Sequence, residues 1–142
     1  VWECSRTPLH NVSLPVLFLL DPKYPYYRKD YEKFRNYDFK KEISLLDLAD
    51  DFLGSVSESQ FKEELILTSE ILRYCCRLGK LQLGTPKLKV QEIDVKDREM
   101  LADKLESIME NYKTMWRATS REGGLKDSLE RFEALLKALR QK

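Results

Sequence analysis

Hydrophobic positions recur with helical spacing through most of the chain, and the stretch from Phe61 to Leu81 carries two such rows. One row contains Phe61, Leu65, Thr68, Leu72, Cys75 and Gly79, and the other contains Leu67, Ile71, Tyr74, Leu78 and Leu81. Glu63, Glu70, Arg73, Arg77 and Lys80 form a single narrow charged stripe. The pattern predicts a helix at about 58–82 that is buried on two faces and forms the centre of a bundle.

Helical spacing also predicts the elements on either side of this central helix. A helix from about Phe39 to Phe52 is expected to be capped by Asp38 and stopped by Gly54. Its predicted inward residues are Phe39, Ile43, Leu45, Leu46, Leu48, Phe52 and Leu53. Two more helices are expected at 95–117 and 125–139, joined by a short turn at 123–124, and 87–94 should be an extended or ordered loop. The sequence therefore predicts an all-α fold: a single domain at 1–142, with a lead-in at 1–22 and one bundle of about five helices at 23–142.

Seven aromatic residues gather between Tyr24 and Phe39, with Tyr26 and Tyr27 among them. Tyrosine rings could provide a stacking platform for sugars or bases, because each ring is apolar and carries a polar hydroxyl group. Packing against the bundle or against a further domain explains the same pattern and is the interpretation we favour.

The charge balance and the hydropathy exclude several classes of partner. The 25 basic and 24 acidic side chains give a net charge of +1, which predicts no binding to nucleic acid or to an anionic membrane surface. The longest apolar run, Leu14 to Leu20, is far shorter than the roughly 20 residues that span a membrane. The three cysteines cannot all pair with one another, which favours reduced thiols and a cytoplasmic location. The chain starts at Val1 without an initiator Met, and we expect it to be a fragment of a longer polypeptide.

No residue pattern predicts a cofactor, a metal site or an independent catalytic centre. His10 is the only histidine, which argues against a His-based metal site and against a Ser-His-Asp triad. Asp47, Asp50 and Asp51 could suggest a metal site, but a solvated acidic helix face is the preferred interpretation. The adjacent Cys75 and Cys76 are expected to be buried structural residues.

The stretch from Trp116 to Ser128, with the sequence WRATSREGGLKDS, resembles the end of a helical domain in the family 20 glycoside hydrolases. That domain follows the catalytic barrel in one subgroup, the β-N-acetylhexosaminidases. The matching residues are Trp116, Arg121, Gly123, Gly124, Leu125, Asp127 and Ser128. Ser120 and Glu122 depart from the family pattern, which usually has Asn and Pro at these positions, so the turn need not have the same conformation.

The resemblance implies a non-catalytic role for this chain. In that family an Asp-Glu pair on the upstream barrel performs the chemistry with the acetamido group of the substrate, and this chain contains no Asp-Glu dipeptide. The implied function is an accessory domain that braces the barrel or forms an oligomer interface, with the upstream barrel of the same polypeptide or a second subunit as its partner. Trp116, Arg121, Tyr26 and Tyr27 are the residues expected to face the barrel or its sugar. The alternatives are a stand-alone helical protein-interaction module and, third, a small enzyme that uses tyrosines and carboxylates.

Overall fold

The computed structural model describes residue 35, residues 37–120 and residues 123–141 of the 142-residue chain. The α-helices in these ranges are α4 (Lys40–Ser55), α5 (Gln60–Leu83), α6 (Val95–Thr119) and α7 (Leu125–Arg140), and a 3₁₀ turn η2 spans Val90–Glu92. The part of the chain that is described contains no strand, so the predicted all-α class is confirmed. It contains four α-helices, and the predicted count of about five differs from this number.

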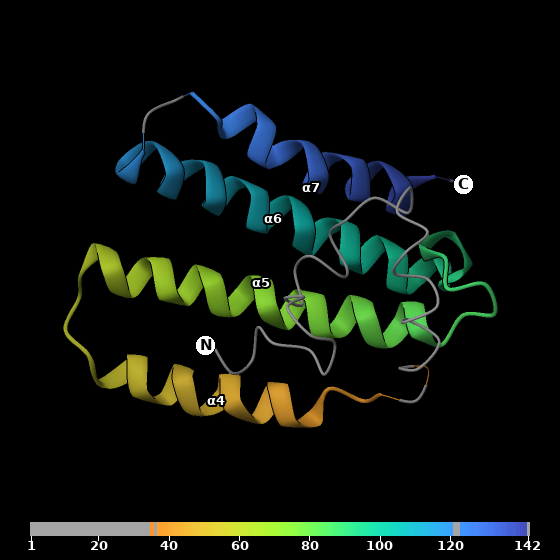
Figure 1. Cartoon of the computed structure of the whole chain (residues 1–142), viewed down its shortest axis with the longest axis horizontal. Coiled ribbons are helices and arrows are strands. Elements are labelled where there is room, and N and C mark those ends of the chain that lie inside the picture. Colours follow the sequence, from red (N-terminus) through yellow and green to blue (C-terminus); the bar gives the residue numbers. More distant parts are fainter. Residues whose placement is uncertain (1–34, 36, 121–122, 142) are drawn as a thin grey trace.

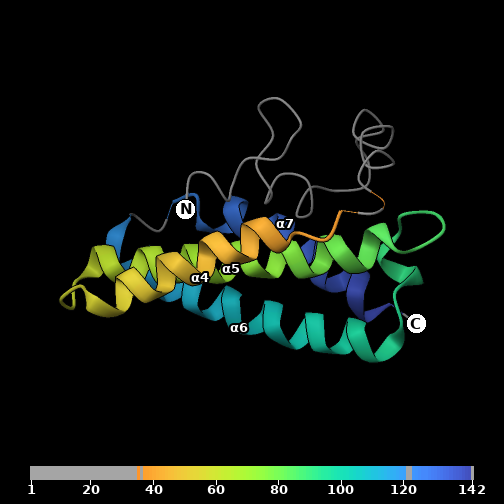
Figure 2. The ribbon, with the colours of Figure 1, turned by 90° about the horizontal axis from the view of Figure 1, so that it is seen from below.

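Successive helices run in opposite directions and lie side by side in chain order, with α4 and α7 at the two edges (Figure 1). Close packing joins α4 to α5, α5 to α6, and α6 to α7, while η2 packs on α7. The row is bent, because α6 lies to one side of α5 and α7 (Figure 2). As a result α5, α6 and α7 share one core, and α4 packs on another side of α5.

The central helix agrees with the prediction, because α5 begins and ends within about two residues of the expected bounds. The hydroxyl oxygen of Ser59 accepts a hydrogen bond from the backbone N–H of Lys62 at 3.2 Å and caps the first turn. Side chains are buried on both flanks of α5, including Leu72 and Cys76. Phe61, which was expected to face inward, is instead 68% exposed, because no described helix covers the first turn of α5 on that side.

The edge helix α4 differs from the prediction at both of its ends. Its N-cap residue is Phe39, in the left-handed conformation with φ 55° and without a side-chain cap. Asp38 was expected to be the N-cap and instead lies one position before it. Its carboxylate still accepts a hydrogen bond from the backbone N–H of Lys40 at 3.1 Å. Gly54 does not stop the helix, which continues to Ser55.

The connection between α5 and α6 is an ordered loop, as the apolar spacing of 87–94 indicated. Leu88, Val90 and Ile93 are all buried, and η2 replaces the extended segment that was considered. The guanidinium group of Arg35 donates hydrogen bonds to the carbonyl oxygens of Thr85 and Pro86, both at 3.0 Å. These bonds attach the chain ahead of α4 to the far end of α5.

Candidate functional site

Of the four residues predicted to form a site, the described ranges include only Trp116. Arg121, Tyr26 and Tyr27 lie outside them. Trp116 is half-buried in the last turn of α6, where its ring lies against the turn that leads into α7. A Cβ atom added to Gly124 would lie 3.5 Å from Cζ2 of Trp116. Gly124 itself has φ 96°, a conformation that glycine adopts without strain. Whether Trp116 contacts a sugar or a barrel stays a prediction.

The ring of Trp116 is connected to the core through other aromatic rings. Its centroid lies 5.8 Å from that of Tyr112, which in turn lies 5.6 Å from that of Phe132 on α7. Phe132 is buried, with 8% of its surface exposed. Contacts of this kind add to the burial energy of aromatic side chains. The rings of Tyr112 and Phe132 therefore connect Trp116 to the core at the end of the bundle.

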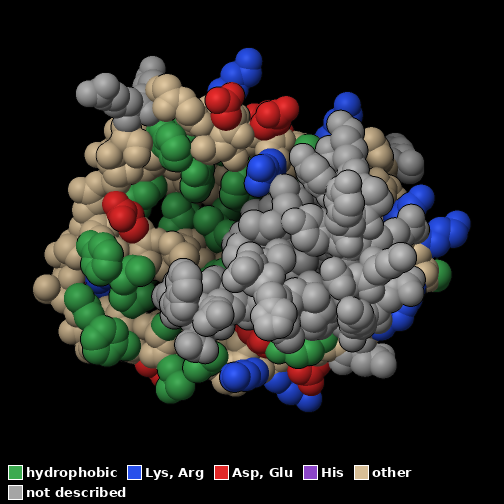
Figure 3. All heavy atoms as spheres, viewed as in Figure 1, with side chains coloured by type: hydrophobic (Ala, Val, Ile, Leu, Met, Phe, Trp, Pro, Cys, Tyr) green, Lys and Arg blue, Asp and Glu red, His purple; other side chains and the backbone are tan. Residues whose placement is uncertain are grey.

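Apolar side chains from two helices gather at this end of the bundle. The start of α5 and the end of α6 lie at the same end (Figure 1), so Phe61 and Leu65 are at the same end as Met115 and Trp116. We call these four residues the end surface. Figure 3 shows hydrophobic side chains around a hollow over this part of α5 and α6. Phe61 is exposed and the other three are half-buried, so the end surface presents aromatic and thioether groups to solvent.

A second apolar surface lies on α4, where sequence reasoning expected the side chains to face inward. Leu48 is 66% exposed, Phe52 is 69% exposed, and Leu45 is half-buried. Ile43 was also predicted to be buried and is 38% exposed. The reason is that α4 packs closely on one helix only, so its apolar positions extend further around the helix than α5 can cover. We call Lys41, Leu45, Leu48 and Phe52 the α4 stripe.

A polar cluster joins α4 to α5, and its charged residues were predicted to face solvent. Arg73 pairs with Asp47 at 2.7 Å and with Asp50 at 2.6 Å. The hydroxyl group of Ser69 donates a hydrogen bond of 2.7 Å to Asp50. These bonds and charges raise the pKa of Arg73, although burial alone would lower it. Asp47 and Asp50 are exposed, at 60% and 43% of their side-chain surfaces, as the prediction of a solvated acidic face requires. The sequence did not predict that they also fasten α4 to α5.

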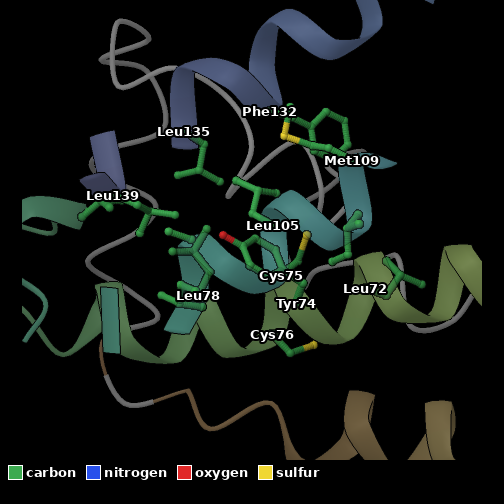
Figure 4. Close-up of a cluster of buried hydrophobic side chains, with 14 of the residues drawn as sticks. Leu72, Tyr74, Cys75, Cys76, Leu78, Leu105, Met109, Phe132, Leu135 and Leu139 are labelled. Carbon is green, nitrogen blue, oxygen red and sulfur yellow. The ribbon is translucent and has the colours of Figure 1, made fainter. Parts of the chain in front are cut away.

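The buried polar and sulfur-containing side chains of α5 belong to the core. Cys75 and Cys76 are fully buried, as expected. Figure 4 shows Cys75 among side chains from α5, α6 and α7, and Cys76 on the side of α5 that faces α4. Burial raises the pKa of the Cys75 thiol and so disfavours the reactive thiolate. Tyr74 is also buried, and no described group lies within hydrogen-bonding distance of its hydroxyl oxygen. Burial raises the pKa of this phenol, and the nearby Cys75 thiol adds to the effect.

Comparison with known proteins does not test the predicted resemblance to the family 20 glycoside hydrolases. Within the described ranges, no group of three or more His, Cys, Asp or Glu side chains is placed to hold a metal ion. None of the helices described is long and apolar enough to cross a membrane. The chain matches no protein family, no curated protein and no solved structure.

Proposed function

We propose that this chain is a non-catalytic helical accessory domain that binds another protein domain through its end surface. We further propose that this domain is the upstream catalytic barrel of a β-N-acetylhexosaminidase-like glycoside hydrolase, to which the chain would belong. In this role the bundle braces the barrel and covers one part of its surface.

The exposure of Phe61 is the observation that carries the proposal. Phe61 begins the row Phe61, Leu65, Thr68 and Leu72, which is fully buried at Leu72 and 68% exposed at Phe61. A row of this kind continues the hydrophobic core to the surface, where a neighbouring domain can extend it. Phe, Trp and Met are also enriched at the centres of protein interfaces, and the end surface contains one of each. Contiguous apolar patches on soluble domains mark such contacts.

The choice of partner comes from the stretch between Trp116 and Ser128. This stretch carries the resemblance to the helical domain that follows the barrel in family 20 enzymes. Trp116 belongs both to the resemblance and to the end surface. Trp116 thus links the stretch that resembles the family to the end surface.

A charge placed on the end surface tests the proposal in the complete polypeptide. We expect Phe61→Glu to lower kcat/KM for an aryl N-acetylglucosaminide by about tenfold, because a carboxylate cannot be buried in an apolar contact. The same variant should melt in two separate thermal transitions, since the bundle and the barrel no longer stabilise each other.

Val95→Glu provides the matched control. Val95 is 57% exposed in the first turn of α6, at the opposite end of the bundle (Figure 1). A glutamate in the first turn of a helix is electrostatically favourable at both positions, so the two variants should fold equally well. The proposed function is wrong if both variants change activity and melting equally. It is also wrong if the complete reading frame contains no barrel-sized segment of roughly 250 residues or more before Val1.

The alternative function is a stand-alone protein-interaction module. The same exposed side chains favour it. It differs from the glycosidase proposal in expecting no barrel-sized segment before Val1 in the complete reading frame. A reading frame that starts near Val1, together with loss of partner binding in Phe61→Glu, would support this alternative and contradict the proposal that the chain belongs to a glycosidase.

A further inference from the structure

We infer that the α4 stripe is the contact between two copies of this chain, which pair their α4 helices in antiparallel orientation around a two-fold axis. This surface is separate from the end surface, and the inference does not require that the partner barrel exists. None of the described helices covers this face of α4, and a second copy would cover it.

The α4 stripe has the shape of a helix-pairing seam. Lys41, Leu45, Leu48 and Phe52 follow one another at intervals of four, three and four residues, the spacing with which two helices interlock their side chains. The side of α4 that packs on α5 is a different one. Leu46, which is fully buried, lies about 160° around the helix from Leu48. Leu48 and Phe52 are therefore about two-thirds exposed, while Leu45 lies at the edge of the α4 stripe and also packs against the core.

The charges beside the α4 stripe favour a second copy as the occupant. Lys41 lies near the start of α4 and Asp51 near its end, and neither forms an ion pair with another described residue. Asp47 and Asp50 both pair with Arg73, whose single positive charge offsets one of their two negative charges. One helix thus carries an unpaired positive group at one end and an unpaired negative group at the other. Such a surface is complementary to itself when it is turned by a two-fold axis.

The positions of these charges determine the register of the pair. Lys41 and Asp51 are ten residues apart, which is about 15 Å along a helix. If the two-fold axis passes level with residue 46, Lys41 lies level with Asp51 of the second copy. Leu45 then lies beside Leu48 of the second copy, and the methylene groups of Lys41 lie over the opposite Phe52 ring. A parallel pair would instead place Lys41 beside Lys41.

The size of the surface indicates a weak, concentration-dependent dimer. The 16 residues of α4 extend over about 24 Å. A single pair of helices of this length gives an interface at or below the lower limit for stable complexes, about 1,200 Å² in total. We therefore expect a dissociation constant in the micromolar range, roughly 1–100 µM.

Sedimentation equilibrium of the whole chain at about 1 µM to 1 mM measures the dissociation constant of the dimer. Variants that reverse the charges at positions 41 and 51 test the inference. Lys41→Glu and Asp51→Lys should each raise the dissociation constant by about tenfold, because each places like charges opposite one another in both halves of the dimer. The double variant Lys41→Glu/Asp51→Lys should return to within about threefold of the original constant. In a parallel dimer each single exchange would replace one pair of like charges by another and would not weaken binding. A double variant that binds as weakly as the single variants overturns the antiparallel register.

Phe52→Ser tests the apolar part of the same contact, with Ile66→Ser as its control. Phe52 is exposed, so its loss should leave the helical circular dichroism unchanged and raise the dissociation constant by at least about tenfold. Ile66 is 42% exposed on α5 and lies outside the α4 stripe, so its replacement should have no effect on dimerisation. A chain that is monomeric at every concentration, or that dimerises equally well with Ser at position 52, overturns the inference.

Discussion

Removing the hydroxyl group of Tyr74 should stabilise the protein, although most substitutions in a core do the opposite. Tyr74 is 4% exposed on α5, and its hydroxyl oxygen has no hydrogen-bond partner among the described residues. Burying a hydroxyl group without a partner costs about 1–3 kcal/mol. Tyr74→Phe removes this cost and keeps the ring that packs among the side chains of α5, α6 and α7 (Figure 4). We expect the free energy of unfolding to rise by about 1 kcal/mol.

Urea denaturation and thermal melting measure the effect directly. For a chain of this length, 1 kcal/mol corresponds to an increase in Tm of about 3 °C. Tyr37→Phe is the control, because the hydroxyl group of Tyr37 donates a hydrogen bond to the carboxylate of Glu42, which is itself buried. Loss of that donor should lower the free energy of unfolding by about 1–3 kcal/mol. The reasoning about Tyr74 is refuted if Tyr74→Phe also destabilises the protein by more than about 0.5 kcal/mol, since the hydroxyl group must then have a partner in solution.

The same two tyrosines should make stability depend on alkaline pH. Burial raises the pKa of Tyr74 and Tyr37 in the folded chain, and the hydrogen bond to Glu42 adds to the effect at Tyr37. Unfolded tyrosine ionises near pH 10. These phenols therefore leave the free energy of unfolding independent of pH below about pH 10. They lower it as the pH rises further, because the unfolded chain ionises first. Between about pH 9 and 11, the free energy of unfolding should fall less steeply in Tyr74→Phe than in the unmodified chain.

The remaining predictions concern other contacts of α5. Leu72→Ala should lower the free energy of unfolding by about 2–5 kcal/mol, because Leu72 is 1% exposed, and a loss below about 0.5 kcal/mol would show that α5 is not central. Arg73→Met should cost about 1 kcal/mol and increase amide hydrogen exchange in α4, since the pairs with Asp47 and Asp50 are lost, and unchanged exchange would contradict this role. The Cys75 thiol should resist alkylation in the folded chain and react only as fast as the chain unfolds; rapid labelling without unfolding would show that it is accessible.

The sequence by itself determined where the helices lie. The periodicity of the apolar residues predicted α5, α6 and α7 with ends within about two residues of those observed. This was possible because helical spacing and the polar residues at helix ends are local properties of the chain. The position of Trp116 beside the Gly124 turn followed from the same local pattern. The predicted roles of Arg121, Tyr26 and Tyr27 lie outside the described residues and stay predictions.

Only the tertiary structure decided which apolar residues are covered. Periodicity shows that a row of side chains is apolar, but burial depends on a neighbour that is distant in sequence. Leu48 and Phe52 continue the pattern of a core-facing helix and remain exposed, because α4 packs closely on one helix only. Phe61 is exposed because the described helices leave the first turn of α5 uncovered on that side.

The tertiary structure also decided which polar side chains pair with one another. Arg73 and Asp47 are 26 positions apart by their numbers, and both belong to stripes that their own helices would leave in solvent. The packing of α4 on α5 brings them to 2.7 Å. Such contacts depend on how two helices are positioned against each other, and the spacing of residues within one helix does not specify that position.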